Sequence, residues 1–246
     1  GPILRDASGL PTRIGHRRLE YSAQRRLTRV IDDGVLPGKP AMLLGQYLHN
    51  ASGARIFKRA QGQDSHYLYH GHRLSAVVRP AIQVAAGSGR LSQAWSVTQR
   101  YIYAQGIPVA MIDYGPDAAA LYFIHSDAIG MPVMISDSQA RPVWRIRPDV
   151  TGYAPPPVTT LARDFPLRLP GQVFDAETGW HDNYLRTYDP SAGHYLEPDP
   201  LGPVPGNSAF GYAAQRFRSH ADPLGLLLFA FDGTRNAPST RTNVWL

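Results

Sequence analysis

Two aspartates near the end of the sequence stand in the same short motif. Asp199 begins Asp-Pro-Leu-Gly, and Asp222 begins a second copy of the same four residues. Two carboxyls held close together push their pKa values apart, so one can take a proton from water while the other gives a proton to a leaving group. Such a pair can hydrolyse a peptide bond. Asp199 and Asp222 are therefore candidate catalytic residues.

Each copy of the motif is also a turn signal. Proline fixes φ, the preceding Asp can accept a hydrogen bond from the backbone two residues on, and Gly supplies the positive φ that closes the turn. Pro200 and Gly202 have these roles in the first copy, and Pro223 and Gly225 have them in the second. The alternative for both aspartates is that they only start turns. We interpret Asp189, in a third Asp-Pro, as structural in this sense.

The residues around the two motifs form a longer pattern. Leu169–Gly179 reads LPGQVFDAETG, and Asn183–Leu196 reads NYLRTYDPSAGHYL, directly before the first turn. Together with the two turns, these residues resemble the RHS-associated core, whose pattern includes PGQ, D-x-E-T-G, Y-x-R-x-Y-D-P and a final DP-x-GL. The resemblance covers Leu167–Leu226.

The resemblance implies both a fold and an activity. In that family the core closes a hollow shell of β-strands and cuts its own chain after the final DP-x-GL. It thus implies a scissile bond between Leu226 and Leu227, with Asp199 and Asp222 as catalytic residues. It also implies a catalytic role for Arg186, which would hold one carboxylate ionised or bind the developing oxyanion. A surface position on a strand is the alternative for this arginine.

The residues before the core predict a series of β-hairpins, in which short apolar or aromatic strands flank polar turns such as Gln105-Gly106. Four such pairs are Arg18–Tyr21 with Leu27–Val30, His66–His70 with Arg73–Val77, Arg100–Tyr103 with Ile107–Asp113, and Leu121–His125 with Gly130–Asp137. This internal repeat resembles degenerate YD repeats. We therefore expect an all-β fold of stacked hairpins that forms part of an RHS shell, with an irregular C-terminal core plug.

Two segments between the hairpins and the core carry other signals. Ser75–Gln99 is rich in Ala, Gln and Ser, and its apolar residues Val84, Leu91 and Trp95 favour a helix there. Tyr153–Pro157 contains three consecutive prolines, which indicates an extended connection at the surface.

The sequence thus divides into five expected segments. Gly1-Pro2 resembles the scar of a cleaved expression tag. The others are degenerate YD/RHS repeats at 3–153, a Pro-rich connection at 154–166, the RHS-associated core at 167–226 and the start of a C-terminal toxin domain at 227–246.

The last segment resembles the opening F-D-G-T-x-N of phospholipase-like α/β-hydrolase effectors delivered by type VI secretion. Asp232 and Thr234 would help to shape an oxyanion site, or form a turn only. No Gly-x-Ser-x-Gly nucleophile elbow occurs in the sequence, so we expect no lipase activity from these 246 residues. Gln215–Phe217 departs from the Asn-Asn-Pro that is usual before the final motif.

Composition narrows the other possibilities. The absence of Cys excludes disulfides and thiolate metal sites, and the longest apolar run, Leu224–Phe231, is too short to span a membrane. A formal charge of +6 suggests an anionic partner, but the basic residues of Arg13–Arg29 occur without a nucleic-acid-binding motif, so we interpret them as a solvated face. His66, His70 and His72 lack an evident further metal ligand, so we expect packing or surface roles, no metal and no cofactor.

The sequence therefore predicts part of an RHS shell that encloses a C-terminal toxin effector and releases it by one self-cleavage after Leu226. The resemblance implies a secreted protein of the type VI route. Its partners would be its own toxin domain, the rest of the shell, a secretion spike, a chaperone and an immunity protein, but no nucleic acid. Two alternatives remain: an extracellular carbohydrate-binding or adhesive β-repeat, favoured by aromatic-x-aromatic strands, and a phospholipase effector in its own right.

Overall fold

The computed structural model describes residues 2–34, 40–84, 91–115, 118–202, 208–213 and 220–226. Within these ranges the chain forms strands and loops, without an α-helix, and all the paired strands are antiparallel. The expected all-β fold is confirmed. The same ranges contain no helix of the length and apolar character needed to cross a membrane.

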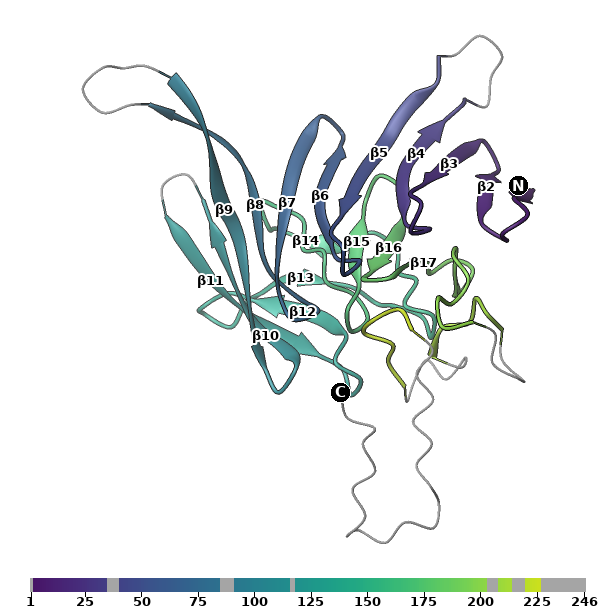
Figure 1. Ribbon diagram of the computed structural model, residues 1–246. Coiled ribbons are helices and arrows are strands. Elements are labelled where there is room, and N and C mark those ends of the chain that lie inside the picture. The colour runs from purple at the N-terminus through teal and green to yellow at the C-terminus, as the bar shows by residue number, and fades with distance from the viewer. Residues whose placement is uncertain are drawn as a thin grey trace, which may run out of the picture.

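Most of the chain forms one curved sheet of 14 strands, in which each strand pairs with its neighbours in sequence (Figure 1). Its strands are β1 (Ile3–Arg5), β2 (Pro11–Ile14), β3 (Arg17–Tyr21), β4 (Leu27–Asp32), β5 (Met42–His49), β6 (Arg55–Ala60), β7 (Gln63–His70), β8 (Arg73–Val84), β9 (Leu91–Ala104), β10 (Ile107–Tyr114), β11 (Ala119–Ser126), β12 (Pro132–Ser136), β13 (Pro142–Arg145) and β14 (Val158–Thr159). The four predicted hairpins all occur in this sheet, so those predictions are confirmed.

The core segment, described at residues 165–202, 208–213 and 220–226, packs against one face of this large sheet (Figure 1). It contains a small sheet of four strands, β15 (Val173–Asp175), β16 (Trp180–Asn183), β17 (Arg186–Asp189) and β18 (His194–Tyr195). One hydrophobic cluster joins it to strands β7–β13 through Tyr67, Met111, Ile135, Trp144, Phe165, Tyr188 and Tyr212, among others. A second cluster joins it to β3–β5 through Leu19, Leu27, Val30, Tyr47, Trp180 and Leu196.

Along the strands of the large sheet, buried and exposed side chains alternate, as is typical of strands with one buried face. In β7, Ser65 and Tyr67 are buried against the core segment, whereas Leu68 between Tyr67 and Tyr69 is 50% exposed. We call the face that carries Tyr67 the inner face. Because the described residues of the core segment pack on the inner face, the large sheet depends on residues far along the chain for burial.

Two kinds of turn recur between the described strands. At Gln61-Gly62 and at the predicted Gln105-Gly106, both residues have positive φ, which is typical of the hairpin turn whose twist matches the sheet. The other kind is a five-residue loop in which the first residue accepts hydrogen bonds from the backbone nitrogens two and four positions on. It occurs at Asp6, Asn50, Asp127, Asp137 and Asp149.

The helix predicted for Ser75–Gln99 is wrong. β8 and β9 instead form the longest hairpin of the sheet, with pairs running from Ala76–Arg100 to Val84–Leu91. Pro80 lies inside β8, where it would interrupt a helix, and cross-strand pairing outweighs the weak helical preference of the Ala and Gln residues.

Candidate active site

Arg186 is the residue around which the predicted site assembles. It opens the interior strand β17 and is 0% exposed. Its Nη2 atom lies 3.1 Å from Oδ2 of Asp199 and 3.2 Å from Oδ2 of Asp222. Its Nε atom donates to the carbonyl oxygen of Gly225 at 2.5 Å. The structure thus brings the three predicted residues to one buried point, and a surface position for Arg186 is excluded.

Each aspartate also closes its own turn. Oδ1 of Asp199 accepts a hydrogen bond from the backbone nitrogen of Leu201 at 2.8 Å, and Oδ1 of Asp222 accepts one from Leu226 at 2.8 Å. In both residues one carboxylate oxygen stabilises the turn and the other faces Arg186. The turn-forming role is therefore compatible with a catalytic one.

Glycines allow the second turn to dock closely on the core. Gly225 has a φ of +63°, and a Cβ there would lie 2.4 Å from the carbonyl oxygen of Asn183. Gly171, in the PGQ stretch, has a φ of +83°, and its Cβ would lie 2.2 Å from the carbonyl oxygen of Pro223. Gly202, in the first turn, has a φ of +90° but nothing within 4 Å. The second turn alone is held between the PGQ stretch and β16–β17.

Tyr195 and Asn183 complete the site, and both are 0% exposed. The Tyr195 hydroxyl donates to Oδ2 of Asp222 at 2.8 Å, and the guanidinium of Arg186 lies 3.7 Å from the Tyr195 ring centre. Asn183 Nδ2 donates to the Tyr195 hydroxyl at 2.6 Å and to the main-chain oxygen of Asp222 at 2.9 Å. Sequence reasoning missed both residues, because a Tyr and an Asn at strand positions indicate packing rather than chemistry.

The charges favour one retained proton. Burial raises the pKa of Asp222; the guanidinium of Arg186 and the hydroxyl of Tyr195 oppose this rise, and the charge of Asp199 adds to it. Since one guanidinium faces two carboxyls, a single proton on the pair would make the cluster neutral. Burial and the charge of Asp222 hold the pKa of Tyr195 well above its usual value, so its hydroxyl remains a donor.

The predicted scissile bond lies at the limit of the described residues. The nitrogen of Leu226 is held by Asp222, as above, and the carbonyl one residue earlier is held by Arg186. Leu227 lies outside the described residues, as do Gln215–Phe217, Asp232 and Thr234, so what the sequence suggests for them remains a prediction.

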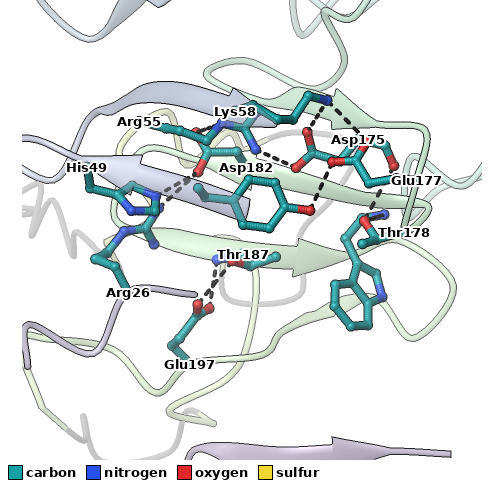
Figure 2. A network of polar contacts seen from close by, with 12 residues as sticks. Arg26, His49, Arg55, Lys58, Asp175, Glu177, Thr178, Asp182, Thr187 and Glu197 are labelled. Carbon is teal, nitrogen blue, oxygen red and sulfur yellow. Dashed lines mark hydrogen bonds and ion pairs between the residues drawn. The ribbon is translucent and has the colours of Figure 1, made fainter. Parts of the chain in front are cut away.

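A second polar cluster joins the two sheets (Figure 2). Its cations are Arg55 and Lys58 of β6 and Arg26, directly before β4; its acids come from the core segment and are Asp175, Glu177 and Asp182. All six belong to segments that meet only in the folded chain. The sequence had placed Arg26 in a solvated face, but it is 4% exposed, so that interpretation is wrong for this residue.

The contacts of this cluster are short and buried. Arg55 Nη1 lies 2.5 Å from Asp175 Oδ2, Lys58 Nζ lies 2.9 Å from Asp175 Oδ1, and Arg26 Nη2 lies 2.9 Å from Asp182 Oδ1. Burial alone would raise the pKa of Asp182, but Arg55, with help from His49 and Arg26, holds it below its usual value. These pairs orient the core segment on the inner face of the large sheet.

Several curated proteins resemble the chain in sequence, although no protein-family model matches it. The double-stranded DNA deaminase toxin A of Burkholderia cenocepacia is 26% identical over 231 residues, which are 85% of this chain and 15% of that protein. The toxin protein Tse5 of Pseudomonas aeruginosa is 32% identical over 56% of this chain and 10% of its own length. The probable deoxyribonuclease RhsB of Dickeya dadantii is 45% identical over 60 residues, 24% of this chain and 4% of its own. The chain thus spans a small part of each relative.

Solved structures share the fold. The TcdB2–TccC3 crystal structure matches with a TM-score of 0.70 and 18% identity over 91% of this chain and 11% of that one. The Photorhabdus luminescens Tc holotoxin pore with a TccC3 mutation matches equally well, with a TM-score of 0.70, 18% identity and the same coverage of both chains. Relatives of the Rhs type and this shared sheet architecture agree with the resemblance of the core. The chain is an RHS-repeat protein. Its phospholipase-like end is supported by none of these comparisons.

The histidines that the structure describes in the RHS-repeat protein do not form a metal-binding cluster. The His66 ring packs against Phe57 and Trp95, with ring centres 5.1 and 4.4 Å apart. His70 ends β7 and His72 follows in the turn to β8. Among the residues that the structure describes, no group of three or more His, Asp or Glu side chains is placed to hold a metal ion.

The remaining basic residues near the N-terminus are largely paired at the surface. Arg13 and Arg18 contact Asp33, and Arg18 and Arg29 contact Glu20, with the three arginine side chains 37 to 44% exposed. These pairs reduce the free positive charge that an anionic partner would meet.

Proposed function

We propose that this RHS chain encloses a C-terminal toxin segment and releases it by hydrolysing its own Leu226–Leu227 bond. The observation that carries the proposal is the position of Arg186 Nη2 between Asp199 and Asp222, with Nε of the same guanidinium on the Gly225 carbonyl. Two carboxyls with unlike surroundings therefore lie beside the turn that leads into the predicted scissile bond.

In the proposed step, the Asp199 carboxylate takes a proton from water while the water oxygen bonds to the carbonyl carbon of Leu226. Asp222, protonated beforehand, gives its proton to the nitrogen of Leu227, and the carbon–nitrogen bond breaks. The products are a new acid at Leu226 and a free amine at Leu227. The pair again holds one proton, and Arg186 remains charged throughout. The reaction acts once, in cis.

The assignment of a shell rather than a toxic activity rests on the relatives. Parts of this chain match a double-stranded DNA deaminase toxin, a probable deoxyribonuclease and a tRNA nuclease, WapA of Bacillus subtilis. Sequence that is shared by proteins with different toxic activities is suited to a task that does not depend on the toxin, such as enclosing it. The fold also matches, over 90% of this chain, a TcdB2–TccC3 structure without its hypervariable C-terminal region.

The proposed role implies an order along the chain. Residues 3–153 would form part of the shell wall, and residues 154–166 would connect this wall to the core at 167–226. Residues 227–246 would be the first part of the enclosed toxin. Relatives that are named as toxins fit export from the producing cell. We propose the type VI route, with a spike, a chaperone and an immunity protein as further partners.

Intact mass of the purified protein tests the proposal. We expect wild-type chain to separate into a fragment ending at Leu226 and a fragment beginning at Leu227, whereas Asp199→Asn and Asp222→Asn remain full length. Asp189→Asn is the matched control, because Asp189 also starts an Asp-Pro turn and its carboxylate binds Ser191 rather than Arg186. Full-length wild type at all times, or cleavage in both variants, would refute self-cleavage.

A further inference from the structure

A cavity of about 340 Å³ lies between the Pro-rich connection and the core segment, apart from the aspartate pair. Its walls are mostly aromatic rings and prolines, and they also include the basic Arg168 and the acidic Asp164. The residues used below are Trp144, Pro155, Phe165, Arg168, Phe174 and His181. The cavity is large enough for one or two side chains of a partner.

Arg168 is the unusual member of this cavity. It is 6% exposed, and its guanidinium carbon lies 4.4 Å from the Phe174 ring centre and 5.6 Å from that of Trp144. Its Nη1 atom donates to the carbonyl oxygens of Phe165 and Leu167, each at 2.9 Å. Nε and Nη2 have no hydrogen bond to any described residue.

A buried guanidinium normally has an acidic partner. The other deeply buried arginines follow this rule: Arg26 pairs with Asp182, Arg55 with Asp175, and Arg186 with two aspartates. Within the described ranges, Arg168 forms no ion pair. Burial lowers its pKa to about 10, so it is still charged at neutral pH, and only the charge of Asp164 acts in the opposite direction.

The surroundings of Arg168 also favour an anion. Burial and the charge of Arg168 hold the pKa of His181 well below its usual value, so this ring adds no second positive charge at neutral pH. Trp144 is 1% exposed, and its indole N–H has no hydrogen-bond partner among the described residues. The cavity thus combines a guanidinium that forms no ion pair with a described residue, the nearby acid Asp164 and apolar walls.

We propose that this cavity binds a carboxylate carried on an apolar body, as presented by an acidic residue next to an aromatic residue in an extended peptide. The carboxylate would accept from the free N–H groups of Arg168, and the apolar part would contact Pro155 and Phe165. This binding does not depend on self-cleavage. It would give the shell a point of attachment for a peptide segment of its cargo or of a neighbouring protein.

Titration calorimetry with paired probes tests the proposal. The peptide arm compares acetyl-Phe-Asp-Phe-amide with acetyl-Phe-Asn-Phe-amide, and the small-molecule arm compares 3-phenylpropionate with 3-phenylpropanamide. We expect each acid to bind at least about tenfold more tightly than its amide, which is the difference of one charge-assisted contact. Tighter binding in the peptide arm supports a peptide as the source of the carboxylate. Equal binding of acid and amide in both arms would overturn the proposal.

Two variants locate the binding. Arg168→Gln should remove the preference for the acid. Ala176→Trp, at an exposed residue that lines the cavity, should weaken the binding of both the acid and the amide in each arm, because the larger side chain narrows the cavity. Ala176→Trp retains Arg168 and its carbonyl contacts, so it tests the site even if Arg168→Gln fails to fold. Undiminished binding by Ala176→Trp, or no binding of any probe to the wild-type chain, would refute this site.

Discussion

The guanidinium of Arg55, on β6, lies 2.5 Å from a carboxylate oxygen of Asp175, which stands 120 positions later on β15. Both side chains are almost completely buried, at 2% and 4% exposure. The contact therefore replaces water for both charges and ties the large sheet to the core segment. Lys58 meets the same carboxylate from the other side (Figure 2).

Breaking this pair should be costly. Arg55→Met leaves Asp175 with one fewer cation, and Asp175→Asn leaves Arg55 without its nearest acid. We expect each variant to lose about 3–5 kcal/mol of unfolding free energy in urea denaturation, because a buried charge remains uncompensated. The matched control is Arg59→Ala, since Arg59 lies on the same strand as Arg55, is 55% exposed where it meets Asp64 of β7, and should shift the midpoint little. Equal shifts for the two pairs would contradict the buried network.

The two Asp-Pro-Leu-Gly turns should differ in their tolerance of a methyl group. Both glycines have positive φ, so Ala at either position costs about 1–2 kcal/mol of backbone strain. Only at Gly225 would the new Cβ also collide with the carbonyl oxygen of Asn183, at 2.4 Å. We expect Gly225→Ala to abolish cleavage as measured by intact mass, and Gly202→Ala to cleave. Normal cleavage by Gly225→Ala would mean that the second turn does not dock as described.

Tyr195→Phe should slow the proposed cleavage without preventing it. The substitution removes the hydroxyl that donates to Asp222 Oδ2. Asp222 becomes charged as it gives up its proton, and a hydrogen bond to a charged group is worth about 1.5–3 kcal/mol, so the rate should fall by roughly 10- to 100-fold in a time course after purification. Tyr184→Phe is the control, because the Tyr184 hydroxyl donates to Ser52 at the surface and contacts none of the described residues of the candidate site. An unchanged rate for Tyr195→Phe would remove Tyr195 from the site.

Glu197 should make stability depend on pH. Burial raises its pKa, although Arg26 and the contacts to Thr187 oppose the rise. A carboxyl whose folded-state pKa lies above its unfolded value contributes stability at low pH and loses that contribution as pH rises through the folded-state pKa. We therefore expect Glu197→Gln to become more favourable relative to wild type as pH rises from about 4.3, the unfolded value, towards neutral.

Urea denaturation of both proteins across that range checks the prediction. The difference in unfolding free energy between Glu197→Gln and wild type should move steadily in favour of the variant. A difference that stays constant, or moves in the opposite direction, would show that Glu197 does not titrate with a raised pKa in the folded chain.

The sequence was most informative where a residue type has few uses. Two aspartates in the same Asp-Pro turn, with an arginine in a recognisable strand motif, predicted the residues that the structure brings together. Asn183 and Tyr195 carried no such signal, because their roles depend on which strand lies beside the second turn. Arg26 was misinterpreted for a similar reason: its partner, Asp182, lies 156 positions away.

The hairpin repeat could be predicted from the sequence only in part. Alternating aromatic strands predicted the hairpins, but the regular spacing of a loop-starting Asp or Asn before a residue of positive φ was overlooked. That spacing fixes the loops at Asp6, Asn50, Asp127 and Asp149, where glycines follow three positions later. The error over Ser75–Gln99 has the opposite origin, since local composition favoured a helix while pairing with a neighbouring strand decided the structure.

The strand order has a consequence for how the protein forms. Every pairing in the large sheet joins neighbours in sequence, so the hairpins can assemble in turn as the chain leaves the ribosome. The acids that neutralise Arg26, Arg55 and Lys58 are translated more than a hundred residues later. Until then these three cations lack the acids that neutralise them in the folded chain. A chain interrupted before Asp175 would therefore expose them to any polyanion nearby.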